Sequence, residues 1–316
     1  MVAAGLVEIL KTARPRQWVK NLTLFAALLF TGNIYTSETW VKEFWIVSEA
    51  TLAFTLVASG IYFLNDVLDL KADQAHPFKK KRPIASGKVS KTTALACFAI
   101  GSAVGLYLSF GLSFLFGVAV LVYWGMQILY SLVLKHIEVV DVFVIALSFF
   151  IRVFAGALVI NAHLSIWFLL CVISTSLFLA VGKRRAELAI LTEQASAVLH
   201  RKVMGKYSPV ILDSYLSMFS TAAFLSWALY TFNFYDQATI VGPVTLPVLS
   251  RTLTINKWLM ATIPVVIFGI MRYLLVIYDG SRAETPERVF FSDPPLLITV
   301  LTWMLMVIGV LYGTWF

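Results

Sequence analysis

Charged side chains are scarce in this sequence. Asp, Glu, Lys and Arg together make up 13% of its 316 residues, whereas an ordinary soluble domain carries about 25%. Hydrophobic residues make up 59%, and the mean hydropathy is +0.84. A chain with so little charge cannot cover a water-exposed surface in the usual way. The composition therefore excludes an ordinary soluble protein and indicates a membrane protein.

Cysteine is almost absent, and no cleavable leader is visible. Cys97 and Cys171 each lie in an apolar run with no Cys or His at metal-ligand spacing, which excludes a disulfide framework and a zinc site. Residues 1–20 contain Arg14, Arg16 and Lys20 instead of a continuous apolar stretch that ends in small residues. We therefore expect the first membrane span to act as its own insertion signal.

Apolar stretches of about 20 residues recur along the chain, and each is long enough to cross about 30 Å of hydrocarbon as a helix. They predict an all-α polytopic membrane protein with a single integral-membrane domain, residues 1–316. About nine transmembrane helices are expected, at residues 21–35, 44–65, 92–110, 112–134, 142–160, 165–182, 208–233, 258–278 and 295–313.

The net charge of +8 is distributed unevenly over the predicted loops. Most Lys and Arg residues lie on one side of the membrane, above all within 11–20, 71–91 and 183–206, whereas the opposite side keeps only Lys42, Arg251 and Lys257. Loops rich in Lys and Arg stay on the cytoplasmic side of a membrane. We therefore expect the N-terminus in the cytoplasm and the C-terminus outside.

Three aspartates follow the second predicted span. Asp66, Asp69 and Asp73 fall at i, i+3 and i+7, so a continuing helix would place them on one face. Carboxylates that converge without intervening cations repel one another, and Mg²⁺ relieves the repulsion because it accepts one or two carboxylates together with water and phosphate. The motif predicts a Mg²⁺ site for a diphosphate, with these three aspartates as ligands. A solvated helix end is the alternative explanation of any single aspartate.

The segment after the aspartates offers side chains suited to phosphate. Pro77, Pro83 and Gly87 break the helix into a loop. Five basic side chains in this loop are placed to reach phosphate oxygens: His76, Lys79, Lys80, Lys81 and Arg82.

One further cation, Arg152, lies inside a predicted span, about ten residues beyond Asp141 and so roughly 15 Å deep. A charge at that depth is costly unless it faces the interior of the bundle or a wet cavity. Two roles stay open: binding of a lipid phosphate, or pairing with an acidic residue such as Asp213.

The motif that runs from Asn65 through the aspartates and His76 to Gly87 resembles the first aspartate-rich motif of the UbiA superfamily of intramembrane prenyltransferases. Other segments resemble one branch of this superfamily, the decaprenyl-phosphate phosphoribosyltransferases: residues 14–21, 130–135 and 182–188, and Pro286-Glu287 with Asp293. The resemblance extends along nearly the whole chain.

This resemblance implies a UbiA-like bundle that transfers 5-phosphoribose from phosphoribosyl diphosphate to a polyprenyl, decaprenyl-like phosphate and releases pyrophosphate. It implies Mg²⁺ as cofactor and a bacterial-type plasma (inner) membrane, with the active site facing the cytoplasm. Catalytic roles are expected for Asp66, Asp69, Asp73 and Lys183. With the charge pattern, it assigns the binding of the two substrates to Arg16, Lys20, Asn65, His76, Lys79, Arg82, Tyr130, Lys135, Arg152, Arg184 and Glu187. No nucleic acid is expected as a partner, and a homo-oligomer is compatible with the sequence.

One departure bears on the substrate. Superfamily members that ionise a prenyl diphosphate carry a second DxxxD pair in a later cytoplasmic loop, and residues 183–207 lack it, offering Lys183, Arg184 and Arg185 instead. Cations suit a donor that has a monophosphate in addition to its diphosphate. A prenyltransferase that joins a polyprenyl diphosphate to an aromatic acceptor stays as the alternative. A transporter is disfavoured because the ionisable residues cluster at one membrane border.

Overall fold

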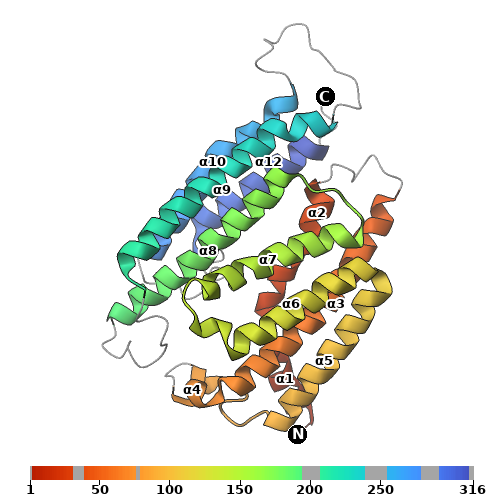
Figure 1. The fold of residues 1–316 in the computed structure, drawn as a ribbon, viewed down its shortest axis with the longest axis vertical. Helices are drawn as coiled ribbons and strands as arrows, with labels where there is room; N and C mark the ends of the chain where they lie inside the picture. Colours follow the sequence, from red (N-terminus) through yellow and green to blue (C-terminus); the bar gives the residue numbers. More distant parts are fainter. Residues whose placement is uncertain are drawn as a thin grey trace. The chain divides into compact units, whose positions relative to one another are not determined.

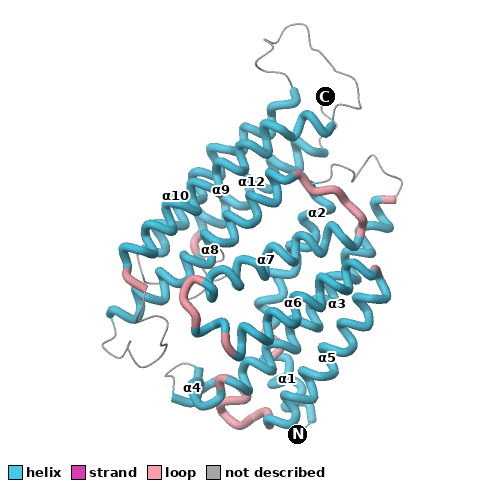
Figure 2. The backbone as a smooth tube through the Cα atoms, viewed as in Figure 1, coloured by secondary structure: helices cyan, strands magenta, loops and turns pink. Residues whose placement is uncertain are grey.

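A computed structural model describes residues 2–30, 39–75, 79–193, 207–238, 255–278 and 292–312. Within these ranges the backbone is helical, with connecting loops and no strand (Figure 2), which confirms the all-α prediction. The described residues fall into two compact units. Unit 1 extends to residue 163 and contains α1 to α7, and unit 2 contains α8 to α12 (Figure 1).

Eight helices of the described part are long and apolar enough to cross a membrane. In unit 1 they are α3 (Trp40–Leu68), α5 (Lys91–Leu112), α6 (Phe114–Leu132) and α7 (Val140–Val159). In unit 2 they are α8 (Ile166–Glu193), α9 (Pro209–Ala238), α10 (Ile263–Tyr278) with the preceding η7 (Ile255–Thr262), and α12 (Pro294–Tyr312). Each coincides with one of the last eight predicted spans.

The first predicted span, residues 21–35, has a different local structure. After α1 (Val2–Thr12), the chain forms the 3₁₀-helix η1 (Pro15–Leu24) and the short α2 (Phe25–Phe30), and residues 31–35 lie outside the described ranges. Pro15 suits the first position of η1, because its fixed φ angle is helical and it has no N–H to satisfy. A ninth membrane span therefore stays a prediction.

An apolar core joins η1, α3, α6 and α7 in unit 1. Leu24, Phe54, Phe116 and Ala155 are completely buried in it. Gly156 of α7 permits the closest approach, because a Cβ atom at this position would lie 2.0 Å from the Leu24 carbonyl oxygen. Close packing of this kind holds helices together in lipid, where the hydrophobic effect between them is lost.

The loops at one end of unit 1 carry the polar motif. α3 is followed there by α4 (Leu70–Ala75), then by η2 (Lys79–Lys81) and the start of α5 (Figure 1). Ser90 caps α5 by accepting a hydrogen bond from the Thr93 N–H at 3.0 Å, which satisfies one of the free donors of the first turn. The 3₁₀-helix η3 (Leu134–His136), which follows α6, reaches the same end.

Unit 2 is held together by aromatic and polar contacts. The Trp227 indole N–H donates to the Thr262 hydroxyl at 2.9 Å, and its ring lies 5.3 Å from that of Trp303. Arg272 of α10 makes two hydrogen bonds to the carboxylate of Asp293, at 3.0 and 2.7 Å. These contacts join α9 to η7 and α12, and α10 to the residue that precedes α12.

Candidate active site

Two of the three motif aspartates lie where α3 ends. Asp66 is in the last turn of α3 and is only 3% exposed. The helix ends at Leu68, and Asp69 caps it by donating its backbone N–H to the Asn65 carbonyl at 2.9 Å. In the next helix, α4, the Asp73 N–H donates to the Asp69 carbonyl at 2.8 Å. The local structure is thus a helix, a one-residue turn and a second helix.

This turn separates the three side chains, so the predicted single carboxylate face does not form. Arg82 Nη1 donates to Asp66 Oδ1 at 3.1 Å and to Asp73 Oδ2 at 2.6 Å. Asp69 instead accepts a hydrogen bond of 2.5 Å from Lys135 of η3. Among the described residues, no three acidic, His or Cys side chains form a group that could hold a metal ion. The carboxylates are arranged as a pair and a separate third.

Cations compensate all three aspartates. In addition to Arg82, Arg14 donates from Nη2 to Asp66 Oδ1 at 2.5 Å, and its guanidinium lies 4.9 Å from the centre of the Tyr62 ring. The cations come from the segment before η1, from the loop after α4 and from η3. The mutual repulsion predicted for the carboxylates is therefore offset, because at least one cation lies within 4 Å of each carboxylate.

Arg14 is a site residue that the sequence analysis did not select. Its backbone is left-handed, with φ 56° and ψ 63°, a conformation that a non-glycine residue keeps only where its surroundings hold it. The hydrogen bond to Asp66 and the contact with the Tyr62 ring stabilise this conformation of Arg14. Signals were present in the sequence: Arg14 opens the segment 14–21, and Tyr62 precedes Asp66 by one helical turn.

The pair of Asp66 and Asp73 fits a divalent cation. Both carboxylates contact one nitrogen, Arg82 Nη1, so a positive centre already lies between them. Their side chains are 3% and 6% exposed. Carboxylate oxygens are the hard ligands that Mg²⁺ prefers, and one or two of them are its usual protein share, with water and substrate phosphate supplying the rest.

Arg152 is 3% exposed within α7. Its guanidinium donates to the Asn21 side-chain oxygen at 2.9 Å, to the Tyr123 hydroxyl at 2.9 Å, and to the carbonyl and hydroxyl of Ser148 at 2.6 and 3.2 Å. Three aromatic rings lie within 5.5 Å of its Cζ atom. No acidic side chain among the described residues pairs with it. Its polar and ring contacts are all to neutral groups.

The other partner proposed for this arginine is engaged elsewhere. Asp213 accepts hydrogen bonds from Arg185 at 2.8 Å and from the Tyr278 hydroxyl at 2.6 Å, both within unit 2. Of the two roles left open for Arg152, the pairing with Asp213 is not supported, because each residue has its described partners within its own unit. A buried arginine needs every polar partner that it can reach, and here a buried asparagine, a serine and a tyrosine take the place of the carboxylate.

Side chains of η1 fasten the N-terminal segment to α3 and α7. The Trp18 indole N–H donates to the Ser59 hydroxyl at 3.1 Å. Asn21 donates to the Thr55 hydroxyl at 2.8 Å while it accepts from Arg152. The segment that leads from the aspartate cluster into the membrane is thus fixed along its length.

The remaining candidates of unit 1 differ in exposure. Arg16 and Lys79 are exposed, Lys135 is buried, and His76 lies outside the described residues. The half-buried candidates are Lys20, Asn65 and Tyr130. Lys135 is the one of these that directly contacts a motif aspartate through a described hydrogen bond.

The candidates of unit 2 lie near the end of α8. Arg184 is 1% exposed and donates to the Glu187 carboxylate at 2.6 Å, one helical turn further on. Lys183 is half-buried beside it in the sequence. A buried guanidinium with a carboxylate on the next turn is a charge held in one orientation, as a phosphate-binding group needs.

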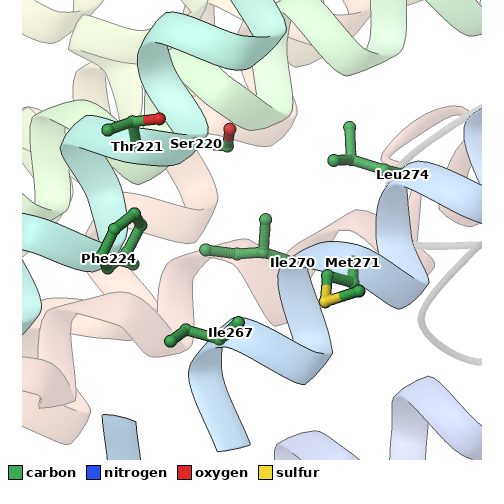
Figure 3. A pocket seen from close by; sticks show the side chains of 7 residues that line it. All are labelled: Ser220, Thr221, Phe224, Ile267, Ile270, Met271 and Leu274. Carbon is green, nitrogen blue, oxygen red and sulfur yellow. The ribbon is translucent and has the colours of Figure 1, made fainter. Parts of the chain in front are cut away.

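Unit 2 also contains a pocket of about 250 Å³ between α9 and α10 (Figure 3). None of its seven lining residues is acidic or basic: Ser220, Thr221, Phe224, Ile267, Ile270, Met271 and Leu274. The pocket can accept apolar chains, and its lining provides two hydroxyl groups but no charged group for a phosphate or a metal ion.

Residues 23–293 match the sequence pattern of the UbiA prenyltransferase family. This chain belongs to the UbiA prenyltransferase family. Membership confirms the predicted superfamily and makes the chain a multi-pass membrane enzyme of the UbiA type, consistent with its eight described candidate spans.

Curated relatives place this UbiA enzyme beside one branch of the family. It is 34% identical over 296 residues to the decaprenyl-phosphate phosphoribosyltransferase of Mycolicibacterium smegmatis, covering 94% of this chain and 90% of the relative. It is also 34% identical over 313 residues to the enzyme of the same name from Corynebacterium glutamicum, covering 96% and 86%.

The fold comparison agrees with the family. The structure of a UbiA homolog from Archaeoglobus fulgidus bound to GPP and Mg²⁺ superimposes with a TM-score of 0.67 at 17% identity, covering 96% of this chain and 99% of that one. At this identity the likeness concerns the fold alone. It confirms the predicted UbiA-like helical bundle.

Proposed function

We propose that this UbiA enzyme transfers 5-phosphoribose from phosphoribosyl diphosphate to a polyprenyl, decaprenyl-like phosphate and releases pyrophosphate. The observation that carries the proposal is the cluster of carboxylates and cations at the end of α3, in a chain whose relatives at 34% identity are named for this activity. The family match extends through both units, so we treat residues 1–316 as one integral-membrane domain.

Donor binding is assigned to the paired aspartates and their arginines. Asp66 and Asp73 would hold Mg²⁺, which neutralises the departing pyrophosphate, and Asp69 is the third proposed ligand. Arg82 and Arg14 would bind phosphate oxygens, because guanidinium groups make short, charge-assisted hydrogen bonds to phosphate. Low exposure of the aspartates strengthens every electrostatic contact made there.

The reaction needs little proton chemistry. An oxygen of the lipid phosphate forms a bond to C1 of the ribose as the bond from C1 to the pyrophosphate oxygen breaks on the opposite face, which inverts C1. A phosphate monoester is already an anion at neutral pH, so no strong general base is required. Arg16 or Lys20 would orient the attacking phosphate by charge. Arg152 has one of its five N–H groups left for that purpose beside its four hydrogen bonds.

A transfer assay tests the proposal and the proposed orientation together. Sealed inverted vesicles should move label from external phosphoribosyl diphosphate into an organic-extractable lipid when polyprenyl phosphate is present, because their outer surface is the cytoplasmic face. Right-side-out vesicles should not do so until they are permeabilised. Label that moves instead from a prenyl diphosphate to an aromatic acid would support the alternative prenyltransferase, and activity in intact right-side-out vesicles would refute the cytoplasmic placement.

The cationic end of α8 yields a separate prediction. Arg184→Ala should raise the KM for phosphoribosyl diphosphate about tenfold to a hundredfold, because a charge-assisted contact to phosphate contributes about 1.5 to 3 kcal/mol. Since Arg184 is buried, the variant also loses packing, so kinetics should be measured on the folded fraction. Arg184→Lys keeps the charge and should recover part of the KM. Equal kinetics in all three proteins would return this residue to a structural role.

A further inference from the structure

The charged side chains at the end of α3 form a neutral set. Three carboxylates and three cations form ion pairs, and their formal charges cancel: Asp66 and Asp73 with Arg14 and Arg82, and Asp69 with Lys135. The two aspartates of the pair are almost completely buried, and both arginines are less than one third exposed. Buried ion pairs of this kind are costly to break when no new partner replaces the old one.

Either ligand of the proposed site, arriving alone, breaks such pairs. Arg82 Nη1 lies between Asp66 and Asp73, so a divalent cation that takes both carboxylates leaves the guanidinium beside a second positive charge. A diphosphate that takes Arg82 leaves two carboxylates close together without their cation. In each case a partly buried charge loses its partner.

When both ligands bind together, every charge has a partner of opposite sign. The carboxylates of Asp66 and Asp73 then pair with the metal ion, and the guanidinium of Arg82 pairs with phosphate. We propose that Arg82 is an exchange residue: it competes with a divalent cation for Asp66 and Asp73, and it transfers to the diphosphate when both ligands bind. Arg14 acts in the same way on Asp66. Metal ion and diphosphate therefore bind synergistically. This inference rests on the proposed function for the presence of a diphosphate at the site.

The exchange predicts that one variant, Arg82→Gln, binds the metal ion alone more tightly than the wild type and binds pyrophosphate more weakly. Arg82→Gln removes the competitor but keeps both carboxylates, so the Kd for Mn²⁺ alone should fall about fivefold or more, while the Kd for pyrophosphate at fixed Mn²⁺ rises. In the wild type, each ligand should lower the Kd of the other by about 5- to 150-fold, a typical range for coupled sites. This factor should be smaller in the variant than in the wild type, where Arg82 and Arg14 both compete with the metal ion. Free Mn²⁺ is measured by electron paramagnetic resonance on the full chain in detergent, with the Mn²⁺–pyrophosphate complex in solution subtracted.

Lys88→Gln is the matched control. It removes one positive charge from the same loop, at an exposed side chain whose described partner is Glu8 at 3.6 Å, and it should leave both affinities unchanged. Arg14→Gln provides a second variant if Arg82→Gln folds poorly, and it should also strengthen the binding of Mn²⁺ alone.

Unchanged or weaker binding of Mn²⁺ alone in both Arg82→Gln and Arg14→Gln would overturn the exchange. Failure of the proposed function gives a different result. If the wild type transfers no label from phosphoribosyl diphosphate but Arg82→Gln still binds Mn²⁺ more tightly, the exchange holds and the donor assignment is wrong.

Discussion

Asp66→Asn should reduce phosphoribosyl transfer by about a hundredfold to a thousandfold, the range found when one group that stabilises transition-state charge is removed. The substitution keeps the shape of the side chain but removes an anionic ligand from the pair with Asp73 and a counter-charge from Arg14 and Arg82. Asp69→Asn should also lose activity, as a proposed ligand in contact with Lys135. Initial rates over a range of Mg²⁺ concentrations measure both effects, and a chelator should stop turnover by the wild type.

The structure reverses the stability effect that the aspartate motif alone suggests. If the carboxylates merely repelled one another, Asp66→Asn would raise the melting temperature. Asp66 is 3% exposed and contacts two arginines. The free energy of unfolding of the variant should therefore fall by about 2 to 3 kcal/mol, somewhat less than the 3 to 5 kcal/mol lost when one partner of a fully buried ion pair is removed. Thermal unfolding in detergent distinguishes the two signs.

Glu8→Gln is the control for this variant. It also removes one carboxylate that two cations contact, Lys11 at 2.8 Å and Lys88 at 3.6 Å, in α1 and outside the proposed site. Its activity should stay at the wild-type level. Full Mg²⁺-dependent turnover in both Asp66→Asn and Asp69→Asn would make the motif a solvated helix end and the assignment of the active site wrong.

Gly156→Ala should destabilise the protein by about 3 kcal/mol or more. The added Cβ would lie 2.0 Å from the Leu24 carbonyl oxygen, and because the obstacle is backbone, η1 and α7 have to move apart. Overpacking of a core typically costs about 1 to 3 kcal/mol, and a backbone clash belongs at or beyond the upper end. Activity should fall as well, since displacement of η1 disturbs the segment that holds Arg14 on Asp66.

Gly125→Ala is the matched control in α6. No atom lies within 4 Å of the Cβ position at Gly125, so alanine should be neutral or stabilise the helix by up to about 1 kcal/mol. Melting temperatures of both variants in the same detergent provide the measurement. If the two variants have the same melting temperature, the close contact between η1 and α7 does not stabilise unit 1.

The membrane helices could be predicted from the sequence because length and apolar character are local properties. Eight of the nine predicted spans therefore match described helices. The first, residues 21–35, stays a prediction, because its described part consists of the end of η1 and the short α2, and residues 31–35 lie outside the described ranges. The spacing of Asp66, Asp69 and Asp73 likewise predicted one shared helix face. It did not predict the turn at Asp69, whose side chain contacts Lys135 of η3.

The partners of the aspartates could not be predicted from spacing. Arg14 and Asp66 are 52 residues apart in the chain, and Lys135 and Asp69 are 66 apart. Such pairs depend on how the helices pack. For the same reason the sequence left two roles open for Arg152, binding of a lipid phosphate and pairing with an acidic residue. Only the packing of α3, α6 and α7 identifies the neutral groups that surround it.

The hydrogen bond between Asn21 and Arg152 also sets an order of events during synthesis. The two residues are 131 positions apart, so at 5 to 20 residues per second roughly 7 to 26 seconds pass between their emergence from the ribosome. Throughout that interval Asn21 lacks the arginine of α7 as a hydrogen-bond partner. When α7 enters the membrane, Asn21 and Tyr123 have already been synthesised and can bind Arg152 at once. Their hydrogen bonds offset the cost of placing a charged side chain in lipid.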